Sequence, residues 1–119
     1  MKRFALLSVT NKQSLRRFAK FLEIQGYDIL SSSGTYQYLQ PHIANLHKIE
    51  DITNYPELLD GQVKSLHPKI HAGILFDRNN PSHIHQLSSQ KIHPIDIVVT
   101  NLYDCKQSPK HIDIGGHTM

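Results

Sequence analysis

The apolar positions along the first part of the chain predict strands that alternate with helices. A short, mainly apolar run at 4–9 is typical of a buried strand. The next apolar residues recur at the spacing of one helix face, and they are Leu15, Phe18, Ala19 and Leu22. Thr10 and Gln13 form a capping-box pattern before this helix, and Gly26 is placed to end it. A second strand is predicted at 27–30.

The rest of the chain continues this alternation. A short helix at 36–39 stops before Pro41, and residues 46–52 are expected to contain a third strand. Another helix is predicted over 82–89, and the run rich in Ile and Val at 95–100 is the clearest strand. Strands that alternate with helices predict an α/β fold with a central, mainly parallel sheet flanked by helices.

Polar clusters follow three of the predicted strands. Thr10, Asn11 and Lys12 follow the first strand, residues 31–35 follow the second, and residues 100–103 follow the strand at 95–100. In parallel sheets ligands bind beyond the carboxyl ends of the strands, so we expect these clusters to converge. The glycine, the three serines and the helix start in 31–35 favour a phosphate ligand. Taken alone, each turn is better explained as a helix cap, and it is the pair of turns at neighbouring strand ends that favours a shared phosphate.

The stretch 58–73 follows no simple structural period. It holds two lysines, two histidines, one serine, two glycines and a proline, which are groups that bind anions and move protons. Lys64 could place positive charge near a developing oxyanion, or could be an ordinary exposed lysine. His67 could orient a reacting group or transfer a proton, or could cap the turn before Pro68. Together with the clusters at the strand ends, this stretch predicts a site for a phosphorylated small molecule.

Composition and charge narrow the classes of function. The 119 residues favour one domain, and 39% apolar with 19% charged residues is a globular composition. The formal charge of +3 is not gathered into a basic stripe, which argues against nucleic-acid binding. No apolar segment has the length of a membrane span or a signal peptide.

Cysteine and histidine usage adds two expectations. Cys105 is the only cysteine, so no intrachain disulfide can form, and a reducing, cytoplasmic location is expected. Nine histidines raise the possibility of a metal site. His67 and His71 are four residues apart but have no acidic metal-binding signature around them, so we expect no metal.

Five segments of the chain, taken in order, resemble the IMP cyclohydrolase domain that accompanies AICAR formyltransferase in a bifunctional protein of purine biosynthesis. The Lys-Ser-Leu-His-Pro-Lys run at 64–69 is the most specific part of this resemblance. The segments are 8–12, 32–35, 55–75, 94–103 and 112–116. The resemblance covers nearly the whole chain and implies a methylglyoxal-synthase-like α/β domain.

The resemblance also implies a reaction and its partners. The formamido group of formyl-AICAR closes onto the carboxamide, water is lost, and IMP forms. The ligand would be a purine ribonucleotide monophosphate, the family needs no metal or organic cofactor for this step, and the domain typically forms a homodimer.

Residue roles follow by the same resemblance. The nucleotide phosphate would be held by Thr10, Asn11, Lys12, Ser32, Ser33, Gly34 and Thr35. The reacting base would be lined by Gln62, Val63, Lys64 and Ser65, and the pocket would be completed by Thr100, Asn101, Tyr103, Asp113 and Ile114. The residues expected to take part in the chemistry are Lys64, His67, Tyr103 and Asp113.

Several departures from the family pattern keep a second hypothesis open. Gln62 stands where the family usually has Arg, Ser65 where it has Thr, and Ser33 where it has Gly. The connection after Tyr103 is shorter than usual, and the sequence ends at Met119, where the family continues into a helix with a catalytic lysine; the formyltransferase domain is not included. These differences predict low turnover that depends on Lys64. The alternative is a catalytically impaired nucleotide- or phosphate-binding module, and methylglyoxal synthase is a weaker enzymatic rival.

Overall fold

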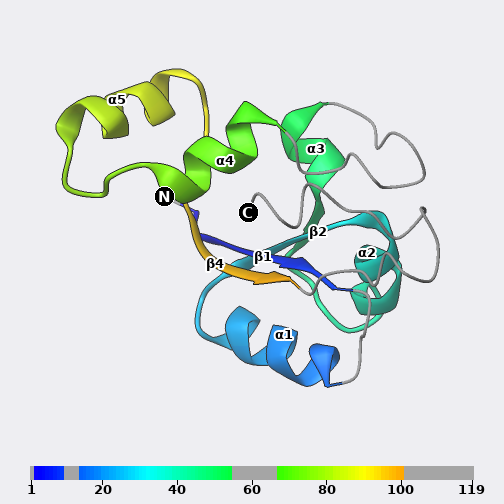
Figure 1. The fold of residues 1–119 in the computed structure, drawn as a ribbon. Coiled ribbons are helices and arrows are strands. Elements are labelled where there is room, and N and C mark those ends of the chain that lie inside the picture. Colours follow the sequence, from blue (N-terminus) through cyan, green and yellow to red (C-terminus); the bar gives the residue numbers. More distant parts are fainter. Residues whose placement is uncertain (1, 10–13, 55–66, 101–119) are drawn as a thin grey trace, which may run out of the picture.

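The computed structural model describes residues 2–9, 14–54 and 67–100, and the structural statements below refer to these ranges. They form a four-stranded sheet with five helices (Figure 1). In chain order the elements are β1 (Phe4–Ser8), α1 (Leu15–Ile24), β2 (Asp28–Ser31), α2 (Ser33–Leu39), β3 (Leu46–Lys48), α3 (Ile49–Thr53), α4 (Pro68–Leu75), α5 (Pro81–Ser89) and β4 (Ile95–Thr100).

All pairs of neighbouring strands are parallel, in the order β3-β2-β1-β4. β1 therefore lies inside the sheet, with β2 on one side and β4 on the other. Phe4 is paired with both Asp28 of β2 and Ile95 of β4, so the amino ends of the three strands are aligned. The parallel α/β fold expected from the sequence is confirmed.

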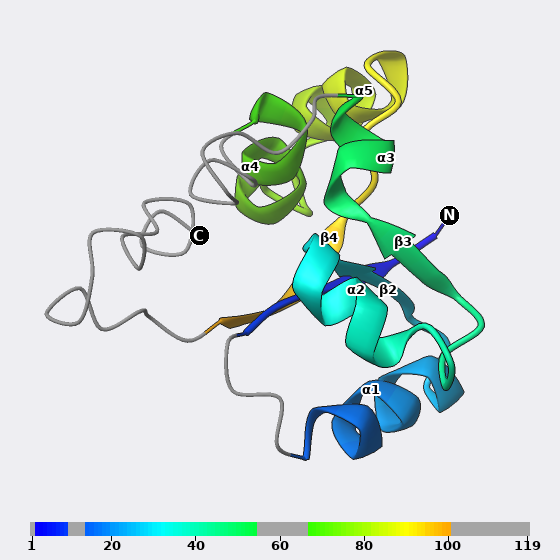
Figure 2. The same cartoon turned by 90° about the vertical axis from the view of Figure 1, so that its right-hand side faces the viewer.

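The two faces of the sheet bury separate hydrophobic clusters. Ala5 and Leu7 of β1 face the layer of α1 and α2, whereas Phe4 and Leu6 face the layer of α3 and α4. Figure 2 shows the sheet between these two helix layers. Because side chains alternate between the faces of a strand, a strand covered on both sides reads as a continuous apolar run. This explains the apolar run at the start of the chain.

The first helix differs from the sequence prediction in two details. Leu15, Ala19 and Leu22 are buried as predicted, but Phe18 is 39% exposed at the edge of the apolar face. Ser14 precedes the helix with a φ of 63° and makes no side-chain capping bond. The capping-box residues at 10 and 13 lie outside the described residues. Gly26, with a φ of 93°, follows the end of the helix as predicted.

Three other elements were predicted incompletely. The expected third strand is limited to Leu46–Lys48, and Ile49 begins α3, where Ile49 and Ile52 lie at helical spacing over the core. α2 begins at Ser33, three residues before its predicted start. α4 was not predicted, because polar residues in 67–73 obscure its apolar positions.

α4 packs closely against the segment that leads into β4. Ile70 is fully buried, and a Cβ on Gly73 would lie 2.6 Å from the carbonyl oxygen of His93. Only a glycine therefore allows this approach without a shift of the main chain. The conclusion that the stretch 58–73 has no structural period is thus wrong for its last third. Among the described helices, none is long and apolar enough to cross a membrane.

Candidate functional site

The carboxyl ends of the four strands lie at one edge of the sheet. Ser8 at the end of β1 is paired with Thr100 at the end of β4, and Ser31 at the end of β2 is paired with Lys48 of β3. The chain runs from β1 to β2 and β3 on one side, and β4 is added on the other side of β1. This reversal beside β1 is the position at which open α/β sheets bind ligands.

Thr35 connects the turn after β2 to the end of β1. Its side chain is 1% exposed, and its hydroxyl donates a hydrogen bond of 3.3 Å to the main-chain carbonyl oxygen of Val9. Val9 immediately precedes Thr10, the first residue of the other turn expected to hold phosphate. The structure thus joins α2 to the point where the chain enters that turn.

The neighbouring hydroxyls differ in how they are used. Ser32 is 8% exposed and occupies the N-cap position of α2, but its side chain makes no capping hydrogen bond. The turn is held instead by the main chain, where the amide of Tyr36 donates to the carbonyl oxygen of Ser32 over 2.7 Å. Ser33 is half-buried and Gly34 is exposed in the first turn of α2. Ser32 thus takes the N-cap position expected of a helix cap in this turn, but its hydroxyl does not cap the helix.

Ser31 belongs to the polar cluster predicted at 31–35, although the family resemblance gives it no role of its own. Its side chain is fully buried, and its hydroxyl has no hydrogen-bond partner within the described part of the chain. Ser31 follows Ile29 by two residues, so its side chain faces the α1 and α2 layer. A buried hydroxyl without a partner costs about 1–3 kcal/mol. A ligand at this edge is one way to satisfy it.

His67 is the N-cap residue of α4. Its Nδ1 accepts a hydrogen bond of 3.1 Å from the main-chain amide of Lys69, and Pro68 occupies the first turn. The capping role considered for His67 is confirmed. Because Nδ1 is an acceptor here, the proton of the neutral ring is on Nε2. Any contact of His67 with a ligand through Nε2 would therefore be as a hydrogen-bond donor.

The remaining predicted site residues fall into two groups. Thr100 ends β4 at the same edge of the sheet as Ser8. The other residues lie outside the described residues, and they are Thr10, Asn11, Lys12, Gln62, Val63, Lys64, Ser65, Asn101, Tyr103, Asp113 and Ile114. Their roles stay predictions. Within the ranges that the structure describes, no group of three or more His, Cys, Asp or Glu residues could hold a metal ion.

Comparisons with known proteins agree with this fold. A family model described as the MGS-like domain matches residues 14–117. The bifunctional purine biosynthesis protein PurH of Thermoanaerobacter sp. (strain X514) is 45% identical over 130 aligned positions, which cover 100% of this chain and 26% of that protein. PurH of Clostridium botulinum (strain Eklund 17B / Type B) is 46% identical over 129 positions, with the same coverage of 100% and 26%. The chain thus spans about a quarter of the length of these curated relatives.

A solved structure described as the "Crystal structure of ForH" is also similar. It matches with a TM-score of 0.81 and 28% sequence identity, over 96% of this chain and 62% of that one. The similarity therefore extends through nearly all of the chain in three dimensions as well as in sequence.

Proposed function

Because this chain belongs to the MGS-like domain family, we propose that it carries out the IMP cyclohydrolase step of purine biosynthesis, the closure of formyl-AICAR to IMP. The homology to bifunctional purine biosynthesis proteins over the whole chain supports this proposal. We assign the function to residues 1–119 as one domain that binds a purine ribonucleotide monophosphate and forms a homodimer.

The hydrogen bond between Thr35 and Val9 is the observation that carries the proposal. It connects the start of α2 to Val9, the residue before Thr10, at the edge of the sheet where a ligand is expected. Ser31 and Ser32 are buried residues that come shortly before Thr35 in the sequence. Neither hydroxyl caps α2. A polar edge of this kind suits an oxygen-rich ligand such as a phosphate ester.

The proposed reaction needs positioning more than strong acid–base chemistry. The carboxamide nitrogen attacks the formyl carbon of the same molecule, a C–N bond forms, and negative charge develops on the formyl oxygen. The C–O bond then breaks and the oxygen leaves as water with two protons, one lost by the carboxamide nitrogen and one by the formamido nitrogen, so formyl-AICAR gives IMP and water. Holding both arms in place supplies much of the rate enhancement of an intramolecular reaction.

Two residues are proposed to stabilise the developing charge. Lys64 would supply the positive charge near the formyl oxygen. His67, whose Nδ1 is occupied by the amide of Lys69, would contribute its Nε2 proton as a hydrogen-bond donor. Tyr103 and Asp113 are proposed to complete the catalytic group, and Thr100 and Asn101 to line the pocket.

The first experiment follows IMP formation from formyl-AICAR by the purified chain and by Lys64→Ala. The loss of one preorganised donor typically lowers the rate about 10²–10³-fold. Lys2→Ala is the matched control, because its side chain is 60% exposed at the amino end of β1. Turnover by Lys64→Ala that equals the unchanged chain would refute the catalytic role. Binding of IMP without any turnover would favour the binding-module alternative.

The second experiment measures IMP binding by calorimetry at low and high salt. Part of the affinity for a phosphate is electrostatic, so binding should weaken as salt is added. Lys12→Ala combined with Thr35→Ala should weaken it further. Affinity that is unchanged in the double variant would place the phosphate elsewhere.

A further inference from the structure

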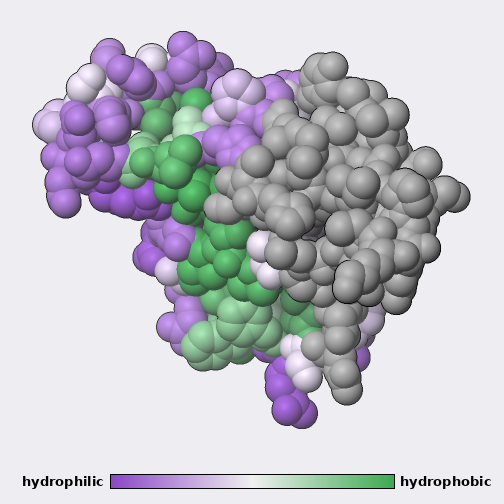
Figure 3. Space-filling view, viewed as in Figure 1, coloured by the Kyte–Doolittle hydropathy of each residue, from purple (hydrophilic) through white to green (hydrophobic). Residues whose placement is uncertain are grey.

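A cavity lies at the opposite edge of the sheet from the candidate site, at the amino ends of β1 and β4. Its volume is about 300 Å³, and every residue that lines it belongs to the described ranges. The apolar wall consists of Phe76, Ile84, Leu87 and Pro94. Figure 3 shows apolar side chains gathered between the hydrophilic surface of α5 and the rest of the molecule. The cavity therefore offers a hydrophobic surface to a small ligand.

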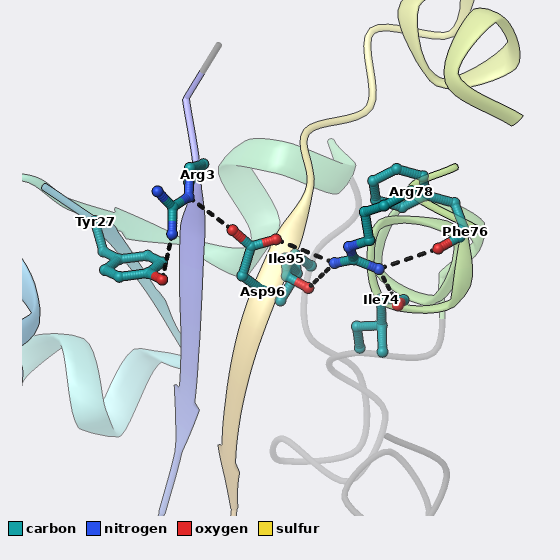
Figure 4. Close-up of polar contacts among 7 residues, drawn as sticks. All are labelled: Arg3, Tyr27, Ile74, Phe76, Arg78, Ile95 and Asp96. Atoms are coloured by element: carbon teal, nitrogen blue, oxygen red, sulfur yellow. Dashed lines mark hydrogen bonds and ion pairs between the residues drawn. The ribbon is translucent and has the colours of Figure 1, made fainter. Parts of the chain in front are cut away.

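The other side of the cavity is charged. Asp96 is shared by two arginines, because Oδ2 accepts from Nε of Arg3 over 2.8 Å and Oδ1 accepts from Arg78 over 3.1 Å (Figure 4). Burial works to raise the pKa of the Asp96 carboxyl, but the hydrogen bonds from Arg3 and Arg78 outweigh burial and hold this pKa below its usual value. Asp96 is thus ionised, and the three groups together carry a net charge of +1.

Arg78 is held rigidly in this arrangement. Its guanidinium donates to the carbonyl oxygens of Ile74 and Phe76 at the end of α4, each over 3.1 Å, and to that of Ile95 over 3.0 Å. It also stacks over the ring of Phe76, 4.2 Å from the ring centre. The last carbonyl oxygens of a helix have no hydrogen-bond donors within the helix, and Arg78 supplies such donors here. A fixed cation therefore borders the apolar wall.

Arg3 is the cation with donor capacity to spare. Its Nε binds Asp96 and one terminal nitrogen donates to the hydroxyl of Tyr27, whose ring the guanidinium also covers at 4.6 Å. Within the described residues, the second terminal nitrogen makes no hydrogen bond. The side chain is 55% exposed, so a ligand can reach it from solvent. Planar guanidinium groups suit carboxylates in particular.

From these features we propose that this cavity binds a small organic monoanion, namely a carboxylate on a flat apolar ring. The ring packs against the wall that includes Ile84 and Leu87, and the carboxylate accepts a hydrogen bond from Arg3. The excess of one positive charge matches a monoanion. The volume lies at the lower end of the range for small-molecule sites, which selects one compact ring system. The site is separate from the candidate site at the carboxyl ends of the strands.

The test uses 2-naphthoate as the probe and 2-naphthamide as its neutral counterpart. The amide signals of an NMR titration should shift for Ile84, Leu87 and Asp96, and should not shift for Ser31 and Thr35. We expect naphthoate to bind about fivefold more tightly than naphthamide, since hydrogen bonds of exposed charges contribute modestly. IMP should not displace the probe. Displacement by IMP, or shifts at the carboxyl edge of the sheet alone, would overturn the proposal.

Two variants separate the apolar and charged contributions. Ile84 is 39% exposed, so Ile84→Trp fills the cavity without a buried clash and should abolish binding of both probes. Ile24→Trp is the matched control, because Ile24 is 71% exposed on α1 and should leave binding unchanged. Arg3→Gln should remove the preference for naphthoate and keep the binding of naphthamide. Equal affinities for both probes in the unchanged chain, or tight binding by Ile84→Trp, would disprove the site.

Discussion

Thr35 and Val9, which are 26 positions apart in the sequence, are joined by a hydrogen bond in which the buried hydroxyl of Thr35 donates to the carbonyl oxygen of Val9. The bond holds the first turn of α2 against the chain as it leaves β1. The first turn of α2 and Val9, the residue that follows β1, are therefore held together at this point, independently of any ligand. A binding site at this place would be partly formed in advance.

The first prediction concerns this bond. Thr35→Val keeps the shape of the side chain but removes the hydrogen bond to the Val9 carbonyl, so the free energy of unfolding should fall by about 0.5–1.5 kcal/mol. IMP should also bind more weakly, because Val9 at the end of β1 loses its hydrogen bond to α2. Thr35→Ser retains the hydroxyl and is the control. Urea unfolding and calorimetry measure both effects, and a fully stable Thr35→Val with normal IMP affinity would contradict the role given to this bond.

The second prediction separates stability from binding at Ser31. Since its hydroxyl has no partner within the described residues, Ser31→Ala should leave the free energy of unfolding unchanged or raise it. The same change should weaken IMP binding about tenfold, if the ligand provides the missing partner. Ser89→Ala is the control, because that serine is exposed at the end of α5 and is far from Ser31 in the sequence. A marked loss of stability in Ser31→Ala would show that the hydroxyl is already satisfied by the protein.

The third prediction divides the two roles of His67. His67→Asn should preserve the cap of α4, because asparagine is a favourable N-cap residue, whereas His67→Ala should lose about 1 kcal/mol of stability. Both variants lack the imidazole Nε2–H, so both should lower the rate of IMP formation to a similar degree. Thermal unfolding and the IMP assay give the two readouts. If His67→Asn retains full activity, the residue has only its capping role.

The fourth prediction concerns pH. The carboxylate of Glu23 accepts from the amide of Asn45 over 2.9 Å, from Lys20 over 2.8 Å and from the amide of Ala44 over 2.8 Å. The Asn45 hydrogen bond is the largest cause that lowers the pKa of Glu23, followed by the one from Lys20. The group is thus more acidic in the folded chain. Its stabilisation is complete above the unfolded pKa of about 4.3 and is lost as the pH falls through the lower folded value.

Glu23→Gln should therefore flatten the dependence of stability on pH below about pH 5. Its amide oxygen can still accept from the two main-chain amides, so the loop at 44–45 should remain in place. Lys20→Met removes the hydrogen bond from Lys20 but keeps the one from the Asn45 amide, which lowers the pKa of Glu23 most. This variant should therefore keep most of the pH dependence. Unfolding by urea at pH 7, 5 and 3.5 provides the comparison, and an unchanged slope in Glu23→Gln would exclude this carboxylate as the source.

The first strand was predictable from the sequence because every residue of β1 is buried. The runs at 4–9 and 95–100 are mainly apolar, with Ser8, Asp96 and Thr100 as their polar residues, and such short runs are typical of strands in a parallel sheet. α3 and α4 were not predicted because each packs only two apolar side chains against the core, Ile49 and Ile52 in α3 and Ile70 and Ile74 in α4. Ile70 and Gly73 mark the buried side of α4, but a small glycine does not register as an apolar position.

The candidate site was predictable in part, for a similar reason. The rule that ligands bind beyond the carboxyl ends of parallel strands directs attention to Ser32 and Thr35 without any structure. The unsatisfied hydroxyl of Ser31 could not be found in this way, because it depends on the direction of one side chain. The contact of Thr35 with Val9 likewise depends on how the turns meet in space. The charged cavity at the other edge joins residues 3, 78 and 96, which no local pattern connects.

The interior position of β1 also shapes how the chain folds. β1, β2 and β3 are contained in residues 4–48, so these three of the four strands can pair through short connections. Phe4 must also pair with Ile95, and that contact closes a long loop from residue 4 to residue 95. Contacts between distant parts of the sequence slow folding, because loop entropy is lost before they form. We infer that β4 docks last, and that until it does, β1 exposes an apolar edge from which newly made chains can associate wrongly.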